Sequence, residues 1–77
     1  MFVRWRKDGL VRTVDMNQVV MVHVDETWGP SQCRVRIDTP NNYSIIAEGL
    51  TLDEAVALEI KLLEAWANRS YNLITLD

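Results

Sequence analysis

The chain has 77 residues, of which 48% are hydrophobic and 25% carry a charge. This composition is typical of a folded globular protein, and the length predicts one domain that covers residues 1–77. The formal net charge of −3 gives no general attraction to nucleic acid or to anionic membranes.

The cysteine content and the apolar runs argue against a secreted or membrane protein. Cys33 is the one cysteine in the sequence, so an intramolecular disulfide is excluded. The first seven residues carry charges where a signal peptide needs an apolar stretch. The longest apolar runs, such as residues 19–22, fall far short of the roughly 20 residues that span a bilayer. We therefore expect a cytoplasmic protein without membrane contact.

The first half of the chain predicts three strands. Residues 2–6 alternate apolar and basic side chains, which is the period-2 pattern of a half-exposed strand. Asp8-Gly9 then predicts a hairpin turn into a second strand at 10–14. Residues 15–18 break the pattern, and the valine-rich segment 19–25 predicts the third strand.

The second half predicts two more strands, at 33–38 and 43–48. Thr51 and Glu54 have the spacing of a capping box, and the strong helix formers that follow predict a helix to about residue 68. The alternation in 71–76 adds a short strand. The predicted fold class is α+β: a small antiparallel β-meander of four or five strands with a short C-terminal sixth strand, and one long C-terminal helix packed on one face.

The strand register follows from pairing Val24 with Val35 and, across a three-residue loop, Ile37 with Ile45. This register predicts a core-facing sheet face formed by Val20, Val22, Val24, Cys33, Val35, Ile37, Tyr43, Ile45 and Ala47. It predicts an outer face formed by Val19, Met21, His23, Asp25, Arg34, Arg36, Ser44, Ile46 and Glu48.

The predicted helix carries an apolar stripe that we expect to face the sheet, formed by Leu52, Val56, Ile60, Leu63, Trp66 and Ala67 and widened by Ala55 and Leu62. Glu59 falls inside this stripe, where an unpaired buried carboxylate would cost several kcal/mol. We expect Glu59 to pair with Arg4, Arg6 or Arg12, or to reach solvent at an edge. A ligand or partner contact is the functional alternative for Glu59. Because the stripe is wide, a homodimer that packs through the helix is a second open alternative.

Catalytic and metal-binding patterns are missing from the sequence. Cys33 and His23 are the only thiol and imidazole, and the predicted register puts them on opposite sheet faces, so they cannot form a nucleophile–base pair. One histidine and one cysteine are too few for zinc, and isolated glycines make no phosphate-binding loop. We expect a protein that is not an enzyme and holds no cofactor or metal.

The outer sheet face and the turn that carries Trp28 are the leading candidate surface for a protein partner. Arginine, methionine and tryptophan are enriched in protein interfaces and their hot spots. The candidate residues are Met21, His23, Trp28, Arg34, Arg36 and Ile46. The alternatives are a solvated face that is stabilised by cross-strand ion pairs and, for Trp28, a ring that folds back as a lid over the edge of the core.

The N-terminal hairpin is the candidate surface for nucleic acid. Residues 1–12 carry a net charge of +3 and the other 65 residues carry −6. Basic side chains around an aromatic ring can follow a phosphate backbone and stack a base. The residues concerned are Arg4, Trp5, Arg6, Lys7 and Arg12.

These patterns favour a small non-catalytic module that binds a protein partner. Nucleic-acid binding through the basic hairpin and a structural homo-oligomer are the alternatives. In size and architecture alone, the predicted molecule is similar to small proteins carried by phages and mobile elements, some of which inhibit host machinery. That resemblance implies a host protein as partner and assigns no residues.

Overall fold

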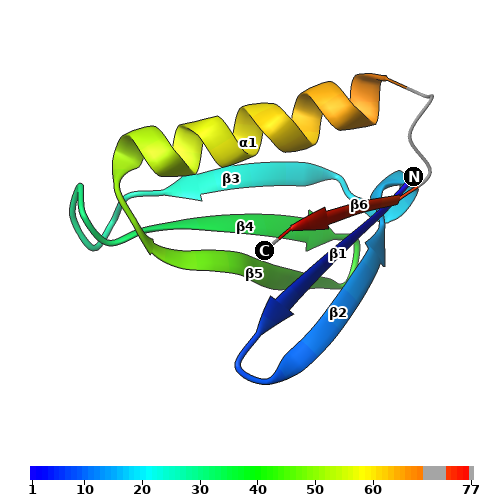
Figure 1. The fold of residues 1–77 in the computed structure, drawn as a ribbon, viewed down its shortest axis with the longest axis horizontal. Coiled ribbons are helices and arrows are strands. Elements are labelled where there is room, and N and C mark those ends of the chain that lie inside the picture. Colours follow the sequence, from blue (N-terminus) through cyan, green and yellow to red (C-terminus); the bar gives the residue numbers. More distant parts are fainter. Residues whose placement is uncertain (69–72, 77) are drawn as a thin grey trace.

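The computed structural model describes residues 1–68 and 73–76. The elements follow in the order β1 (Phe2–Lys7), β2 (Leu10–Asp15), the 3-10 helix η1 (Met16–Gln18), β3 (Met21–Asp25), β4 (Cys33–Thr39), β5 (Asn42–Leu50), α1 (Leu52–Ala67) and β6 (Leu73–Leu76) (Figure 1). The predicted α+β class, the long C-terminal helix and the short sixth strand are confirmed. Residues 71 and 72, which the prediction placed in that strand, lie outside the described residues.

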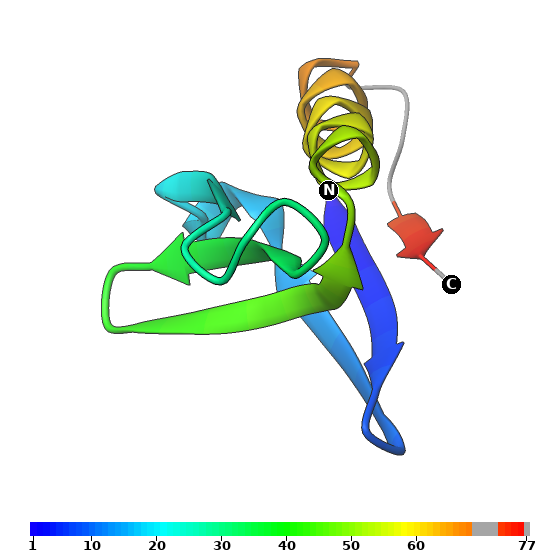
Figure 2. The same ribbon diagram turned by 90° about the vertical axis from the view of Figure 1, so that its left-hand side faces the viewer.

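The strands form two three-stranded sheets rather than one continuous meander. The strand orders are β2-β1-β6 and β3-β4-β5, and the β1–β2 hairpin projects away from the second sheet (Figure 2). η1 divides the two sheets, because its short turn interrupts the strand pairing and buries Met16 completely. β6 pairs with β1 in parallel, with Ile74 opposite Val3. The sequence pattern predicts neither the partner nor the direction of this strand.

Local sequence signals place the first hairpin and the helix start as predicted. Asp8 and Gly9 have φ angles of 53° and 78°, the left-handed conformation that a tight hairpin turn requires. At the helix start, the Glu54 backbone N–H donates to Thr51 Oγ1 over 3.2 Å. Glu54 Oε1 in turn accepts from the Thr51 backbone N–H over 3.0 Å, which completes the capping box.

The turn between β4 and β5 is one residue shorter than predicted. Thr39 pairs with Asn42, so Pro40 and Asn41 alone connect the strands. Ile37 therefore faces Ser44 instead of Ile45. Because side chains alternate across a strand, this one-residue slip moves the start of β5 to the opposite face from the predicted one.

A β-bulge then restores the predicted register further along β5. Arg36 pairs with Ile45, whereas its neighbour Val35 pairs with Ala47, so Ile46 is the inserted residue. Ile46 is only 5% exposed and belongs to the core, while Tyr43 at the start of β5 is 58% exposed. The predicted places of Tyr43 and Ile46 are both wrong, because the shorter turn directs Tyr43 outward and the bulge places Ile46 in the core.

The core lies between the two sheets and beneath α1. Its buried members are Val3, Trp5, Met16, Val19, Cys33, Val35, Ile37, Ile46, Ala55, Leu62 and Leu76. Val19 is buried and Val20 is exposed, the reverse of the prediction, because η1 ends just before Val19 and β3 begins only at Met21.

α1 covers the β3-β4-β5 sheet with one edge of the predicted stripe, where Ala55 and Leu62 lie, and not with its centre. Its buried residues are Ala55, Leu62 and Ala65, and the small alanines allow the helix to approach the sheet closely. We call the helix stripe the row of large apolar residues left between 37% and 46% exposed, namely Leu52, Val56, Ile60, Leu63 and Trp66. The expectation that this row packs on the sheet is wrong. None of the helices in the described ranges has the length and hydropathy needed for a membrane span.

Candidate functional site

The outer face of the β3-β4-β5 sheet carries a row of cross-strand ion pairs. Arg34 lies directly opposite Asp25, and its Nη2 donates to Asp25 Oδ2 over 2.9 Å. The guanidinium of Arg34 lies 5.9 Å from the centre of the Trp28 ring. Trp28 stands in the β3–β4 turn and is 67% exposed. Trp28 is thus exposed in the turn, and its ring lies against Arg34, which is ion-paired with Asp25.

A second cluster of the same kind lies at the other end of the face. Arg36 Nε lies 3.0 Å from Asp38 Oδ1, and its Nη2 lies 3.2 Å from His23 Nε2. His23 Nε2 also lies 2.8 Å from Asp38 Oδ2. The guanidinium of Arg36 stacks over Tyr43, with 5.0 Å between Cζ and the ring centre. An exposed aromatic ring, an arginine and a carboxylate are therefore grouped here as they are around Trp28.

The hydrogen bonds of this face hold its carboxylates in the ionised form. Thr27 donates to Asp25 and Arg34 adds its charge, so the pKa of Asp25 lies well below its ordinary value. Contact with His23, followed by the charge of Arg36, lowers the pKa of Asp38 in the same way. At neutral pH both arginines thus lie against full negative charges, and their orientations are fixed.

The structure brings together five of the six residues predicted for protein binding. Met21 pairs with Asp38 on the outer face and is 52% exposed. His23, Trp28, Arg34 and Arg36 lie on this face or at its edge, as described above. Ile46 does not, because the bulge in β5 turns it into the core, so its assignment to the surface is wrong.

Sequence reasoning missed Tyr43 as a member of this face. Strand alternation carries no signal for it, because its place depends on the turn, in which Pro40 and Asn41 alone connect the strands and direct Tyr43 outward. We define the aromatic–arginine face as the exposed surface formed by Met21, His23, Asp25, Trp28, Arg34, Arg36, Asp38 and Tyr43. A shallow groove of about 410 Å³ next to Trp28 is also lined by Arg34 and Glu48.

The basic hairpin does not present the surface expected for nucleic acid. Trp5 is 3% exposed and cannot stack a base. Lys7 forms ion pairs with Glu48 at 2.6 Å and with Asp8 at 3.2 Å, and these contacts raise its pKa. Arg4 and Arg6 are exposed on one side of β1. Arg12 is exposed as well, but it projects from the opposite side of the sheet, because it pairs with Trp5.

Glu59 is half-buried rather than enclosed in the core, because the helix stripe faces outward. Within residues 1–68 and 73–76, it forms no ion pair with Arg4, Arg6 or Arg12, so the expected pairing is wrong for the described part of the chain. The other expected outcome, a carboxylate that reaches solvent, agrees with its partial exposure.

Cys33 and His23 lie on opposite faces of the sheet, as predicted. Cys33 is fully buried, its Sγ lies 3.5 Å from the Gly29 carbonyl oxygen, and burial raises the pKa of the thiol. The reactive thiolate is therefore disfavoured. His23 Nε2, which would have to act as a base, is already in contact with Asp38 and Arg36. In the part of the chain that the structure describes, no three His, Cys, Asp or Glu residues are grouped as metal ligands.

No protein-family model, curated protein or solved structure matches the chain.

Proposed function

We propose that the protein is a non-catalytic protein-binding module that engages its partner through the aromatic–arginine face. The observation that carries the proposal is the exposure of Trp28 and Tyr43, each stacked on an arginine that a carboxylate holds in place. Tryptophan, tyrosine and arginine are the residue types that dominate binding hot spots. Contacts that fix these side chains before binding reduce the entropy lost in the complex.

The charges of the face indicate the kind of partner. Arg34 and Arg36 are neutralised by Asp25 and Asp38, so the face has no large excess of either charge. Such a surface suits a protein partner with apolar pockets for the two aromatic rings and paired polar groups around them. In size and predicted architecture the chain resembles small phage and mobile-element proteins, some of which act as inhibitors, so we propose host machinery as the first class of partner to test.

Capture from a native cell lysate, with and without nuclease, tests the proposal. We expect Trp28→Ala and Arg36→Glu each to abolish retention of the nuclease-resistant partner, while far-UV circular dichroism remains that of a folded protein. Trp66→Ala, on the helix, and Arg6→Glu, on the hairpin, are matched controls that should leave capture intact. If capture survives both changes on the aromatic–arginine face, the partner binds elsewhere.

A homo-oligomer is the second candidate function, and the helix stripe is the observation that favours it. Five large apolar residues in a row remain between 37% and 46% exposed on one side of α1. Contiguous exposed apolar patches mark interaction sites. Four members and Glu59 follow the alternating four- and three-residue spacing of a coiled-coil seam, from Leu52 to Trp66.

Nucleic-acid binding is the weaker alternative. The hairpin keeps exposed arginines, but its aromatic residue Trp5 is buried and Lys7 is paired with carboxylates. The nuclease arm of the capture experiment tests this alternative. Loss of all captured material after nuclease treatment would favour the hairpin over the aromatic–arginine face.

A further inference from the structure

The outer edge of β6 is a second place where the molecule can receive a chain. In the described residues β6 lies at the end of the strand order β2-β1-β6, so it pairs with β1 on one side only. Alternate backbone N–H and C=O groups of an edge strand point away from the sheet and need partners. Residues Leu73–Leu76 have no charge, proline or bulge that would discourage strand addition there. The edge is therefore chemically suited to an extended backbone.

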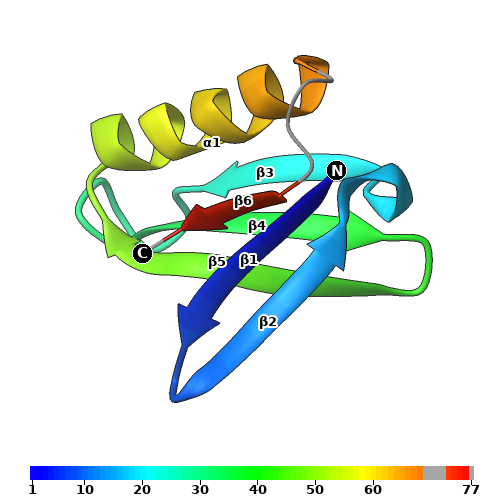
Figure 3. The same cartoon turned by 45° about the vertical axis from the view of Figure 1, so that its right-hand side comes forward.

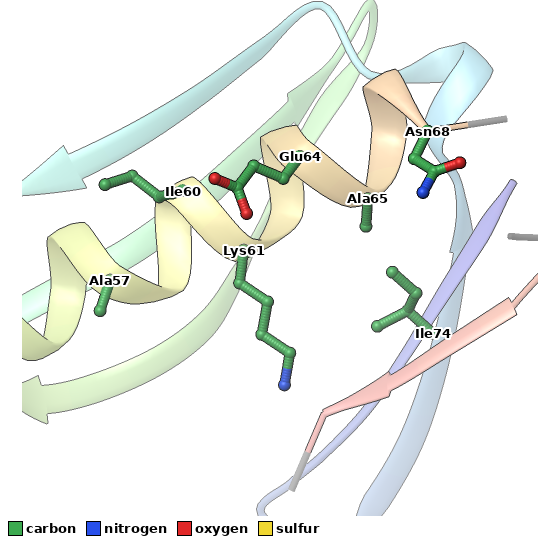
Figure 4. A pocket seen from close by; sticks show the side chains of 7 residues that line it. All are labelled: Ala57, Ile60, Lys61, Glu64, Ala65, Asn68 and Ile74. Carbon is green, nitrogen blue, oxygen red and sulfur yellow. The ribbon is translucent and has the colours of Figure 1, made fainter. Parts of the chain in front are cut away.

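A groove of about 450 Å³ runs between this edge and α1. Figure 3 shows β6 lying below the helix and beside β1. Figure 4 shows that Lys61 extends from the helix toward β6 and that Ile74 points from β6 toward Ala65. Ala57, Ile60 and Ala65 supply apolar surface on the helix side. A side chain of an added strand would therefore meet apolar surface and one ammonium group.

The charged side chains that line the groove indicate which charged group its occupant should carry. In the described part of the chain, Lys61 forms no ion pair. Glu64 also lines the groove, three residues further along the helix. On the outer side of the sheet, Thr75 of β6 lies opposite Arg4 of β1, so a second cation flanks the edge. A carboxylate in the occupant would have Lys61 within the groove and Arg4 beyond it.

We propose that the groove binds an extended peptide of a partner protein, which adds to β6 as a strand. The peptide alternates apolar side chains, which enter the groove beside Ile74, with polar ones on the outer side, and it carries a carboxylate that reaches Lys61. A helical peptide in the groove would leave the outward backbone N–H and C=O groups of β6 unpaired, whereas an added strand forms hydrogen bonds with them.

A separate hollow of about 410 Å³ lies beside Thr75 and Leu76 of β6. The hollow is also lined by Arg4 and Arg6, which again favour a carboxylate in the occupant.

Selection from a phage-displayed library of random short peptides, with the full chain as bait, tests the proposal. We expect enriched peptides to alternate apolar and polar residues and to contain aspartate or glutamate. The strongest binder is then synthesised with a fluorescent label and with N-methylation at each backbone nitrogen in turn. Strand addition predicts loss of binding at every second position only, because those N–H groups donate to β6. Binding that tolerates every N-methyl group would overturn the proposal.

Substitutions on the protein locate the site. Ala57→Trp fills the groove, and Ala67→Trp places the same side chain on the same helix outside the groove lining. We expect Ala57→Trp to weaken binding of the labelled peptide at least about tenfold, and Ala67→Trp to leave it unchanged. Lys61→Glu should weaken peptides that contain a carboxylate and spare those in which it is replaced by an amide. Equal binding to the wild-type and Ala57→Trp proteins would overturn the proposal.

Two further outcomes separate this site from the other surfaces. Trp28→Ala should leave peptide binding unchanged, because the groove is independent of the aromatic–arginine face. Peptide binding that Trp28→Ala abolishes would overturn the assignment to β6. The last measurement is sedimentation of the protein without peptide. If the protein is a dimer and Ala57→Trp dissociates it, a second copy occupies the groove, and the peptide proposal is refuted.

Discussion

Arg36 lies over the ring of Tyr43, with 5.0 Å from its Cζ atom to the ring centre, and the same guanidinium lies against Asp38. The contact joins the middle strand of the sheet to the start of β5, and the ring beside it remains 58% exposed. The contact thus stabilises the fold, and it also supports one of the two aromatic side chains that we propose to bind the partner.

Removing the ring is expected to destabilise the protein modestly. A cation–π contact at an exposed site contributes about 0.5–1 kcal/mol, so Tyr43→Ala should lower the free energy of unfolding by about that amount or somewhat more. Urea unfolding, followed by tryptophan fluorescence, measures the change. Tyr43→Phe keeps the ring and is the control, which should remain within about 0.5 kcal/mol of wild type. An equal loss in both variants would assign the effect to the hydroxyl instead.

The stability of the fold is expected to fall in acid through Asp38. His23 and Arg36 lower the pKa of this carboxyl below its ordinary value of 3.8, so folding favours the ionised form. That contribution is complete above the ordinary value and is lost as pH falls from there through the lowered value of the folded state. Asp25 has a lowered pKa too and contributes in the same direction.

Asp38→Asn should therefore lower stability at neutral pH and flatten its dependence on pH in acid. Urea unfolding curves collected between neutral pH and about pH 2 should draw together for the wild-type and Asp38→Asn proteins as the pH falls, because the Asp38 carboxyl progressively loses the charge that Asn never has. Curves that stay separated by the same free energy at every pH would show that Asp38 acts through packing or hydrogen bonding rather than through its charge.

The bulge in β5 predicts opposite roles for two adjacent isoleucines. Ile46 is 5% exposed in the core, whereas Ile45 is half-buried opposite Arg36. Ile46→Ala should cost about 2–5 kcal/mol, because it leaves a cavity in the core. Ile45→Ala should cost about 1 kcal/mol, a typical value for a partly exposed position. Chemical denaturation of the two variants decides, and a larger loss for Ile45→Ala would contradict the register.

Features set by a few neighbouring residues could be predicted from the sequence. Asp8 and Gly9 fix a tight turn by their backbone preferences, and Thr51 and Glu54 start the helix by hydrogen bonds to each other's backbone. The outer-face arginines followed from strand alternation alone, since the pairing of Val24 with Val35 was predicted correctly.

Features set by long-range contacts could not be predicted. The β5 register depends on a turn one residue shorter than expected and on the bulge at Ile46, and alternation along the strand does not reveal either. α1 is apolar around much of its surface, so its hydrophobic pattern does not decide whether Ala55 or Leu63 faces the sheet. The close approach of the helix to the sheet, which the small side chain of Ala55 allows, decides which side of the helix is buried. The parallel pairing of Ile74 with Val3 joins opposite ends of the chain and has no local signal.

The helix stripe makes the homo-oligomer directly testable. Association through this seam would bury Leu63 and Trp66 against a second copy, so the melting temperature should rise with protein concentration. Leu63→Glu should abolish that dependence by placing a charge in the seam. Leu10→Glu, at a residue that is 53% exposed on β2, is the matched control and should preserve it. Differential scanning calorimetry over about a hundredfold range of concentration measures the effect.

A substitution of Glu59 also tests the homo-oligomer, and it is expected to strengthen association where Leu63→Glu weakens it. It occupies a seam position between Val56 and Leu63, where a carboxylate from each copy would oppose association. Glu59→Leu should therefore strengthen association, while added salt should strengthen it in the wild type by screening the acidic helices. α1 carries four acidic residues and one lysine, a net charge of −3, so the salt effect should be measurable by sedimentation equilibrium. If the wild-type and Glu59→Leu proteins remain monomeric at every concentration and salt level, the stripe is no seam between copies of this chain, and the homo-oligomer is ruled out in favour of a partner of another sequence.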